Sequence, residues 1–131
     1  MNLVDNFLIF FLSIQKVFLH LTRLVKIKYI NLKTTGEIIR EKREEKGLLL
    51  RELAASLKID SAILSKLERG ERKPTKEQLI KIAKLLGLDQ KELILSWISD
   101  KIVYEIADEK YGVEALKIAE KKVEYLKIKK A

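Results

Sequence analysis

Cationic side chains that could neutralise phosphate groups gather in the middle of this sequence. Between residues 58 and 84 the chain has eight Lys or Arg against four Asp or Glu, whereas residues 89–109 have two against six. The whole chain of 131 residues has a net charge of +8. This distribution favours a polyanionic partner that meets one part of the surface, although lysines also serve simply to solvate helices.

Groups suited to catalysis or metal binding are scarce. The chain has no cysteine and a single histidine, His20, far from the serines in its middle. It has no glycine-rich phosphate loop, and paired carboxylates such as Glu44-Glu45 and Asp108-Glu109 alternate with Lys, as on solvated helix faces. We therefore predict a protein that is not an enzyme, has no metal or cofactor, and works in the reducing cytoplasm.

Two short helices between residues 50 and 69 must position the central cations. Strand-like alternation is missing from this part of the chain, and one proline and five glycines leave long stretches free to be helical. Apolar residues recur at helical steps around a polar break at 58–61, namely Leu53, Ala54, Leu57, Ile59, Leu64 and Leu67. The pattern predicts an all-α fold in which two helices meet at a tight turn.

Capping residues and glycines predict where the other helices begin and end. Thr, Ser, Asp and Pro favour the start of a helix, and Gly favours its end. The predicted helices, with their flanking residues, cover about 36–46 (Thr35, Gly47), 50–57, 61–69 (Asp60 or Ser61, Gly70), 75–86 (Pro74, Gly87), 90–109 (Asp89) and 113–130 (Gly112).

These residues together resemble the helix-turn-helix domains of the lambda-repressor and Cro type, also called Xre-like regulators. The resemblance covers about residues 36–88 and rests on Gly36, Ile39, Arg40, Arg43, Gly47, Leu48, Glu52-Leu53-Ala54, Leu57, Leu64-Ser65, Glu68-Arg69-Gly70, Arg72, Pro74, Leu79, Ile82-Ala83 and Leu86-Gly87. It implies a bundle of about five helices, with residues 35–88 as the DNA-binding domain and one further C-terminal helix. It also implies an ion pair between Arg43 and Glu68 that holds the first helix against the recognition helix.

Two positions depart from the family pattern. Leu50 stands where the family often has a polar residue that contacts a phosphate, and Arg51 is the candidate to replace that contact. Lys58 stands where the turn usually has glycine, so it would adopt a left-handed conformation at a cost of about 1 kcal/mol or relax the turn.

By this resemblance the outward face of the helix at 61–69 would enter the DNA major groove. The expected base-reading residues are Ser61, Ala62, Ser65 and Lys66, of which Lys66 is the candidate for a guanine edge. This set offers few specific contacts, so phosphates and DNA shape are expected to supply much of the affinity and specificity. The expected phosphate-binding residues, each of which could instead be a solvated surface cation, are Arg40, Arg51, Lys58, Arg69, Arg72 and Lys73.

The C-terminal residues 89–131 have more apolar surface than a small helical core requires. We predict a homodimer that sets two recognition helices about 34 Å apart on a palindromic operator. In the alternative, the same helices fold back and complete the core of the monomer. The predicted dimer interface consists of Leu93, Trp97, Ile98, Ile102, Ile106, Leu116 and Val123.

The N-terminal residues 1–34 contain all four phenylalanines of the chain. They fit an amphipathic helix with one apolar stripe, or else a stretch translated from a wrongly assigned start, which would have no function. Membrane contact of residues 1–30 is disfavoured, because the longest uncharged run, residues 6–15, falls short of the roughly 20 residues needed. The predicted stripe is Phe7, Phe11, Ile14, Phe18, Leu21 and Val25.

The leading functional hypothesis is a sequence-specific, DNA-binding transcriptional regulator, most simply a dimeric repressor with residues 61–69 in the major groove. The alternative is an antitoxin-like or restriction-modification-associated controller, whose C-terminal helices bind a partner protein.

Overall fold

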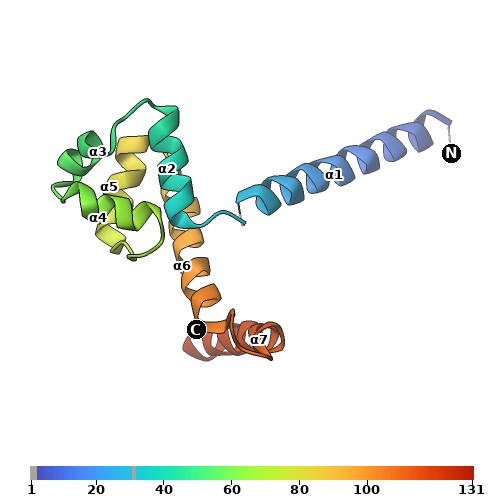
Figure 1. Ribbon diagram of the computed structural model, residues 1–131. Coiled ribbons are helices and arrows are strands. Elements are labelled where there is room, and N and C mark those ends of the chain that lie inside the picture. The colour runs from blue at the N-terminus through green and yellow to red at the C-terminus, as the bar shows by residue number, and fades with distance from the viewer. Residues whose placement is uncertain (1–2, 31) are drawn as a thin grey trace.

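The computed structural model describes the backbone of residues 3–30 and 32–131 and the side chains of residues 3–21 and 32–131. The described residues form helices and no strand (Figure 1), which confirms the predicted all-α class. Helices α2 to α6 pack into one bundle, while α1 and α7 project from it. The helices are α1 (Leu3–Ile30), α2 (Thr35–Glu45), α3 (Leu50–Leu57), α4 (Ser61–Glu68), α5 (Lys76–Leu86), α6 (Gln90–Ile106) and α7 (Gly112–Lys130).

The core of the bundle is built from apolar side chains of all five packed helices. Of the inward positions predicted for the two short helices, Ile59 and Ile63 are half-buried against this core and the others are buried in it. Leu64 on α4 and Leu79 on α5 have no exposed surface, as expected for side chains that anchor neighbouring helices. The buried set is Ile39, Leu53, Ala54, Leu57, Leu64, Leu67, Leu79, Ile82, Ala83, Leu86 and Leu93.

Helix α6 belongs partly to this core, which bears on two expectations. Leu93 is only 2% exposed and Trp97 packs against the buried cluster. These two predicted interface residues therefore contribute to the chain's own core, as in the alternative in which the C-terminal helices complete the monomer. The packed unit also continues past residue 88, where the sequence placed the end of the DNA-binding domain, because α6 packs against α2 and α5.

The N-terminus of α2 lies one residue earlier than predicted. Thr34 is the capping residue: its hydroxyl accepts a hydrogen bond from the Glu37 N–H at 3.3 Å, and the Glu37 carboxylate accepts one from the Thr34 N–H at 2.8 Å. This reciprocal arrangement needs Glu three residues after the cap, a spacing that Thr34 has and Thr35 lacks. Thr35 is instead the first helical residue and is buried.

Gly36 lets α2 approach the end of the recognition helix closely. A Cβ atom at this position would lie 2.5 Å from the carbonyl oxygen of Leu67 and 2.6 Å from that of Glu68. Such distances are far inside van der Waals contact, so a side chain here would separate the two helices.

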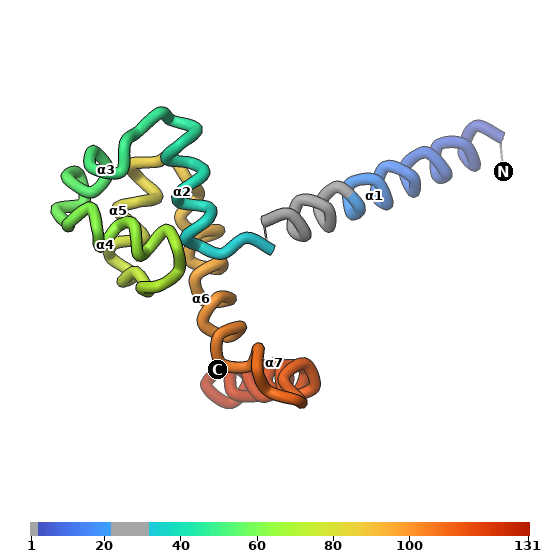
Figure 2. Tube along the Cα trace, in the orientation of Figure 1, coloured from blue at the N-terminus to red at the C-terminus, as the bar shows by residue number. Residues whose placement is uncertain are grey.

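Helix α1 stands apart from the bundle (Figure 2). Its described side chains, residues 3–21, are exposed on all sides, so the apolar surface is wider than the predicted stripe. Val25 of that stripe lies outside the described side chains. The 19 residues Leu3–Leu21 are long and apolar enough to cross a membrane, in contrast to the prediction from the uncharged run, because a span tolerates the few charges present here. Signal sequences share this length and composition.

Candidate nucleic-acid interface

Helices α3 and α4 form the predicted pair, joined by a tight turn at Lys58. The Lys58 backbone has φ 57° and ψ 42°, the left-handed conformation expected if lysine replaces the usual glycine. The turn is held by the Ile59 N–H, which donates to the Ala54 carbonyl at 3.1 Å. Asp60 then caps α4, because its carboxylate accepts a hydrogen bond from the Ala62 N–H at 2.7 Å.

The outward face of α4 contains the four residues expected to read bases. Ala62 and Lys66 are exposed, whereas Ser61 and Ser65 are half-buried. The Ser65 hydroxyl accepts a hydrogen bond from Arg69 Nη1, so one of its lone pairs is occupied. Lys66 forms no ion pair with any described residue and is free to reach outward.

The orientation of α4 is set by a buried ion pair with α2. Arg43 donates from Nε and Nη2 to the two carboxylate oxygens of Glu68 at 2.7 and 2.9 Å, and from Nη1 to the Leu48 carbonyl at 2.8 Å. The hydrogen bond to Glu68 raises the pKa of Arg43. The pair implied by the family resemblance is thus present, and its two parallel hydrogen bonds restrict how α4 can rotate against α2.

The cations expected to contact phosphates fall into two groups. Arg40 is paired with Glu44 at 2.9 Å, and Arg69 is paired with Glu71 at 2.6 Å. The Arg69 guanidinium in turn lowers the pKa of Glu71 through their hydrogen bond. The cations without an ion pair to a described residue are Arg51, Lys58, Arg72 and Lys73.

The sequence analysis missed both of the acidic partners. Glu44 follows Arg40 by four residues on a helix, so helical spacing alone could have found this pair. Glu71 lies two residues after Arg69 in the turn that leaves α4, where no regular spacing predicts a contact.

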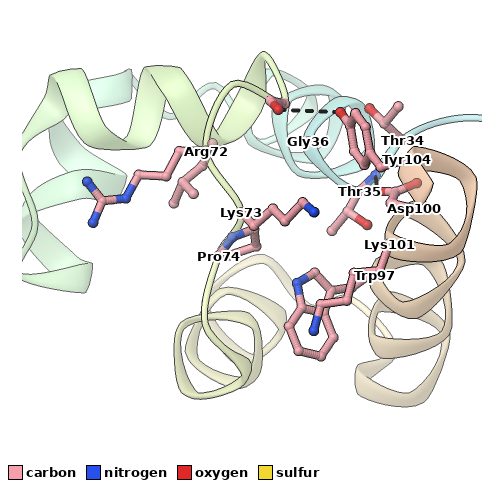
Figure 3. Close-up of a pocket in the computed structure, with 12 residues that line it drawn as sticks. Thr34, Thr35, Gly36, Arg72, Lys73, Pro74, Trp97, Asp100, Lys101 and Tyr104 are labelled. Atoms are coloured by element: carbon pink, nitrogen blue, oxygen red, sulfur yellow. Dashed lines mark hydrogen bonds between the residues drawn. The ribbon is translucent and has the colours of Figure 1, made fainter.

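The second half of α6 packs against the loop that follows the recognition helix (Figure 3). The Tyr104 hydroxyl donates to the Gly70 carbonyl at 3.4 Å, and Lys73 Nζ lies 5.1 Å from the centre of the Tyr104 ring. In Figure 3 Lys73 reaches toward Tyr104, whereas the Arg72 guanidinium points away from this contact. Nothing in the local sequence predicted that α6 touches the loop.

The same part of α6 also holds the start of α2. Asp100 Oδ2 accepts a hydrogen bond from the Thr35 N–H at 2.8 Å, and the Thr35 hydroxyl donates to Ser96 Oγ at 3.1 Å. The Asp100 carboxylate thereby places a negative charge at the positive end of the α2 dipole. Lys101 Nζ sits 3.2 Å above the Trp97 ring beside these contacts, in a favourable cation–π arrangement.

The arrangement presents cations of the kind that could neutralise phosphates. Among the described residues no three His, Cys, Asp or Glu side chains are close enough to hold a metal ion. The four expected phosphate-binding cations that form no ion pair with a described residue flank the recognition helix α4 in the sequence. Arg51 lies in α3, Lys58 in the turn before α4, and Arg72 and Lys73 in the loop after α4.

Comparisons with known proteins agree with this architecture. Residues 39–93 match the family model described as Helix-turn-helix. The HTH-type transcriptional regulator DdrOP3 of Deinococcus deserti is 38% identical over 58 residues, which are 44% of this chain and 45% of that protein. The matched part thus spans less than half the length of this relative.

Two solved structures are also similar. A hypothetical protein from E. coli has 23% identity and a TM-score of 0.52, over 65% of this chain and 87% of that one, which shows a shared fold. The restriction-modification controller protein C.AhdI from Aeromonas hydrophila has 32% identity and a TM-score of 0.42, over 45% of this chain and 89% of that one. Through residues 39–93, this chain is similar to the helix-turn-helix regulators of the lambda-repressor and Cro type.

Proposed function

We propose that this chain is a sequence-specific DNA-binding transcriptional regulator that works as a dimer in the cytoplasm and represses by occupying a promoter. The observation that carries the proposal is the exposed face of α4, with Ala62 and Lys66 presented outward while Arg43 and Glu68 fix the helix from behind. The relative from Deinococcus deserti, itself named a transcriptional regulator, supports the same function.

The sparse base-reading face suggests how binding energy is divided. Lys66 can donate to a guanine edge, and Ala62 can contact a thymine methyl group, but neither is a bidentate reader. Phosphate contacts from Arg51, Lys58, Arg72 and Lys73 would then supply most of the affinity, and two copies on a palindrome would supply the specificity.

Footprinting on the DNA upstream of the protein's own gene tests the proposal directly. We expect a protected palindromic site whose affinity falls steeply with salt. The variant Lys66→Ala should weaken binding by about 1–3 kcal/mol and relax base preference at one position per half-site.

The control for this variant is Lys84→Ala, which removes the same charge from the exposed end of α5 and should leave base preference intact. If the two variants lost the same affinity for the specific site and for scrambled DNA, the assignment of α4 as the helix that reads bases would be refuted.

A second candidate function is an antitoxin-like or restriction-modification-associated controller that binds a partner protein through its C-terminal helices. The observation in its favour is that α7 exposes large apolar side chains along its length, among them Ile118 and Tyr125. Co-expression with the products of neighbouring genes, followed by purification of a stable complex, would distinguish this candidate from a regulator that acts alone.

A further inference from the structure

An open groove lies between α2 and the start of α6, away from the α3–α4 pair. It has a volume of about 250 Å³. Its apolar floor is formed by Ile38, Leu88 and the edge of the buried Leu93, and its rim carries the carboxylates of Glu41, Asp89 and Glu92. Lys33, 2.7 Å from Glu41, is the only cation that lines it among the described residues. The groove is therefore acidic in a chain whose net charge is +8.

Helix α7 has a face that complements this groove. Ile118, Lys121, Lys122 and Tyr125 are spaced three and four residues apart, so they share one side of the helix, and together with Leu126 they line a shallow hollow. All five are exposed. The α7 face thus combines apolar side chains with two lysines, and the groove combines an apolar floor with three carboxylates. The two surfaces are complementary in both polarity and charge.

The α7 helix of the same chain does not reach this groove. The groove lies at the first turn of α6, and α7 begins beyond its last turn, about 25 Å away for a helix of 17 residues. The corner between them is tight: a Cβ on Gly112 would lie 2.4 Å from the Ile106 carbonyl oxygen, and the Gly112 N–H donates to the Glu109 carbonyl at 3.0 Å. From this corner α7 crosses the C-terminal end of α6, the end opposite the first turn (Figures 1 and 2).

We infer that the groove binds the Ile118–Leu126 face of α7 from a second copy of this chain. Each copy has one groove and one α7, so a two-fold axis fills both grooves at once and leaves no open surface for further growth. The opposite charges of the two surfaces select this pairing over α7 with α7 or groove with groove. The inference rests on the proposed dimeric function and specifies which surfaces form the dimer.

Charge reversal on each surface tests the exchange in the full-length chain. The groove variant is Glu41→Lys with Glu92→Lys, and the helix variant is Lys121→Glu with Lys122→Glu. We expect the wild type to sediment at twice the chain mass of 15.2 kDa, and each variant to raise the dimer dissociation constant at least about tenfold through like-charge contacts.

Mixing the two variants gives the decisive result. In a mixed dimer, each groove meets an α7 of opposite charge, so an equimolar mixture should regain the dimer that neither variant forms alone. A variant with Glu77→Lys and Glu105→Lys, both exposed and outside the two surfaces, has the same charge change as the groove variant and should remain dimeric. Circular dichroism during thermal unfolding verifies that all variants are folded.

Three outcomes would overturn the inference: a monomeric wild type, a dimer that resists both reversals, or a mixture that stays monomeric. A dimer that resists both reversals would assign the contact to another surface, such as α1. A wild-type dimer that follows the expected pattern but binds no operator DNA would refute the proposed function and leave the inference standing. A chain that binds operator DNA but does not exchange α7 would support the proposed function and refute the inference.

Discussion

At the scale of single residues, the Arg43–Glu68 pair is predicted to determine whether the bundle is stable. Glu68 is 5% exposed and Arg43 is 9% exposed, so removing either partner leaves a charge that water reaches poorly. Glu68→Ala should lower the free energy of unfolding by about 3–5 kcal/mol in urea titrations. The double variant Arg43→Met, Glu68→Leu should lose much less, because it leaves no unpaired buried charge. A single variant that costs no more than the double one would show that the pair is not effectively buried.

Glu71 is predicted to restrain DNA binding by holding Arg69. The Arg69 guanidinium lowers the pKa of Glu71, so this contact is kept above the ordinary carboxyl pKa and lost only as the pH falls through the lowered value. Substitution is therefore the practical test at neutral pH. Glu71→Gln should tighten DNA binding at low salt and steepen the salt dependence by about one phosphate contact, a slope change of roughly 0.9.

The control for the release of Arg69 is Glu77→Gln, which removes an exposed charge that forms no ion pair with any described arginine. Fluorescence anisotropy across a salt series measures both variants. The same slope change in both would mean that only net charge matters and that Arg69 does not reach a phosphate.

At the scale of elements, α6 is predicted to fasten the start of α2. Asp100→Ala removes the acceptor of the Thr35 N–H and the negative charge at the helix N-terminus, so it should lower the free energy of unfolding by about 1–2 kcal/mol. Ser99→Ala, on the exposed side of the same turn, should change stability by less than about 0.5 kcal/mol. Chemical denaturation followed by Trp97 fluorescence would measure both, and equal values would argue against a specific contact.

Most helix boundaries were predictable because their causes are local, although α2 begins one residue early and α6 ends at Ile106 rather than near residue 109. Gly70 and Gly87 do leave their helices at φ 75° and 67°, and Asp89 and Asp60 do cap α6 and α4. The contacts of α6 with Thr35 and Gly70 join residues 65 and 34 positions apart, so no short pattern contains them. The same reason explains why Leu93 was assigned to an interface: an apolar stripe shows that a face must be covered, but not by which chain.

At the scale of the whole molecule, the bundle and α1 are predicted to be energetically independent. The described α1 side chains are exposed, and the core contains no residue from them. Removing residues 1–30 should therefore leave the free energy of unfolding of the bundle unchanged within about 0.5 kcal/mol, while solubility rises because a long exposed apolar surface is lost.

Urea unfolding monitored by Trp97, the single tryptophan, compares the full-length and shortened chains. A matched variant with Phe7→Ser, Phe10→Ser and Phe11→Ser keeps the chain length and should reproduce the gain in solubility. A drop in stability on truncation would mean that α1 packs on the bundle in solution and covers part of it. The groove and the α7 face both lie outside residues 1–30. The shortened chain should therefore keep the proposed dimer contact.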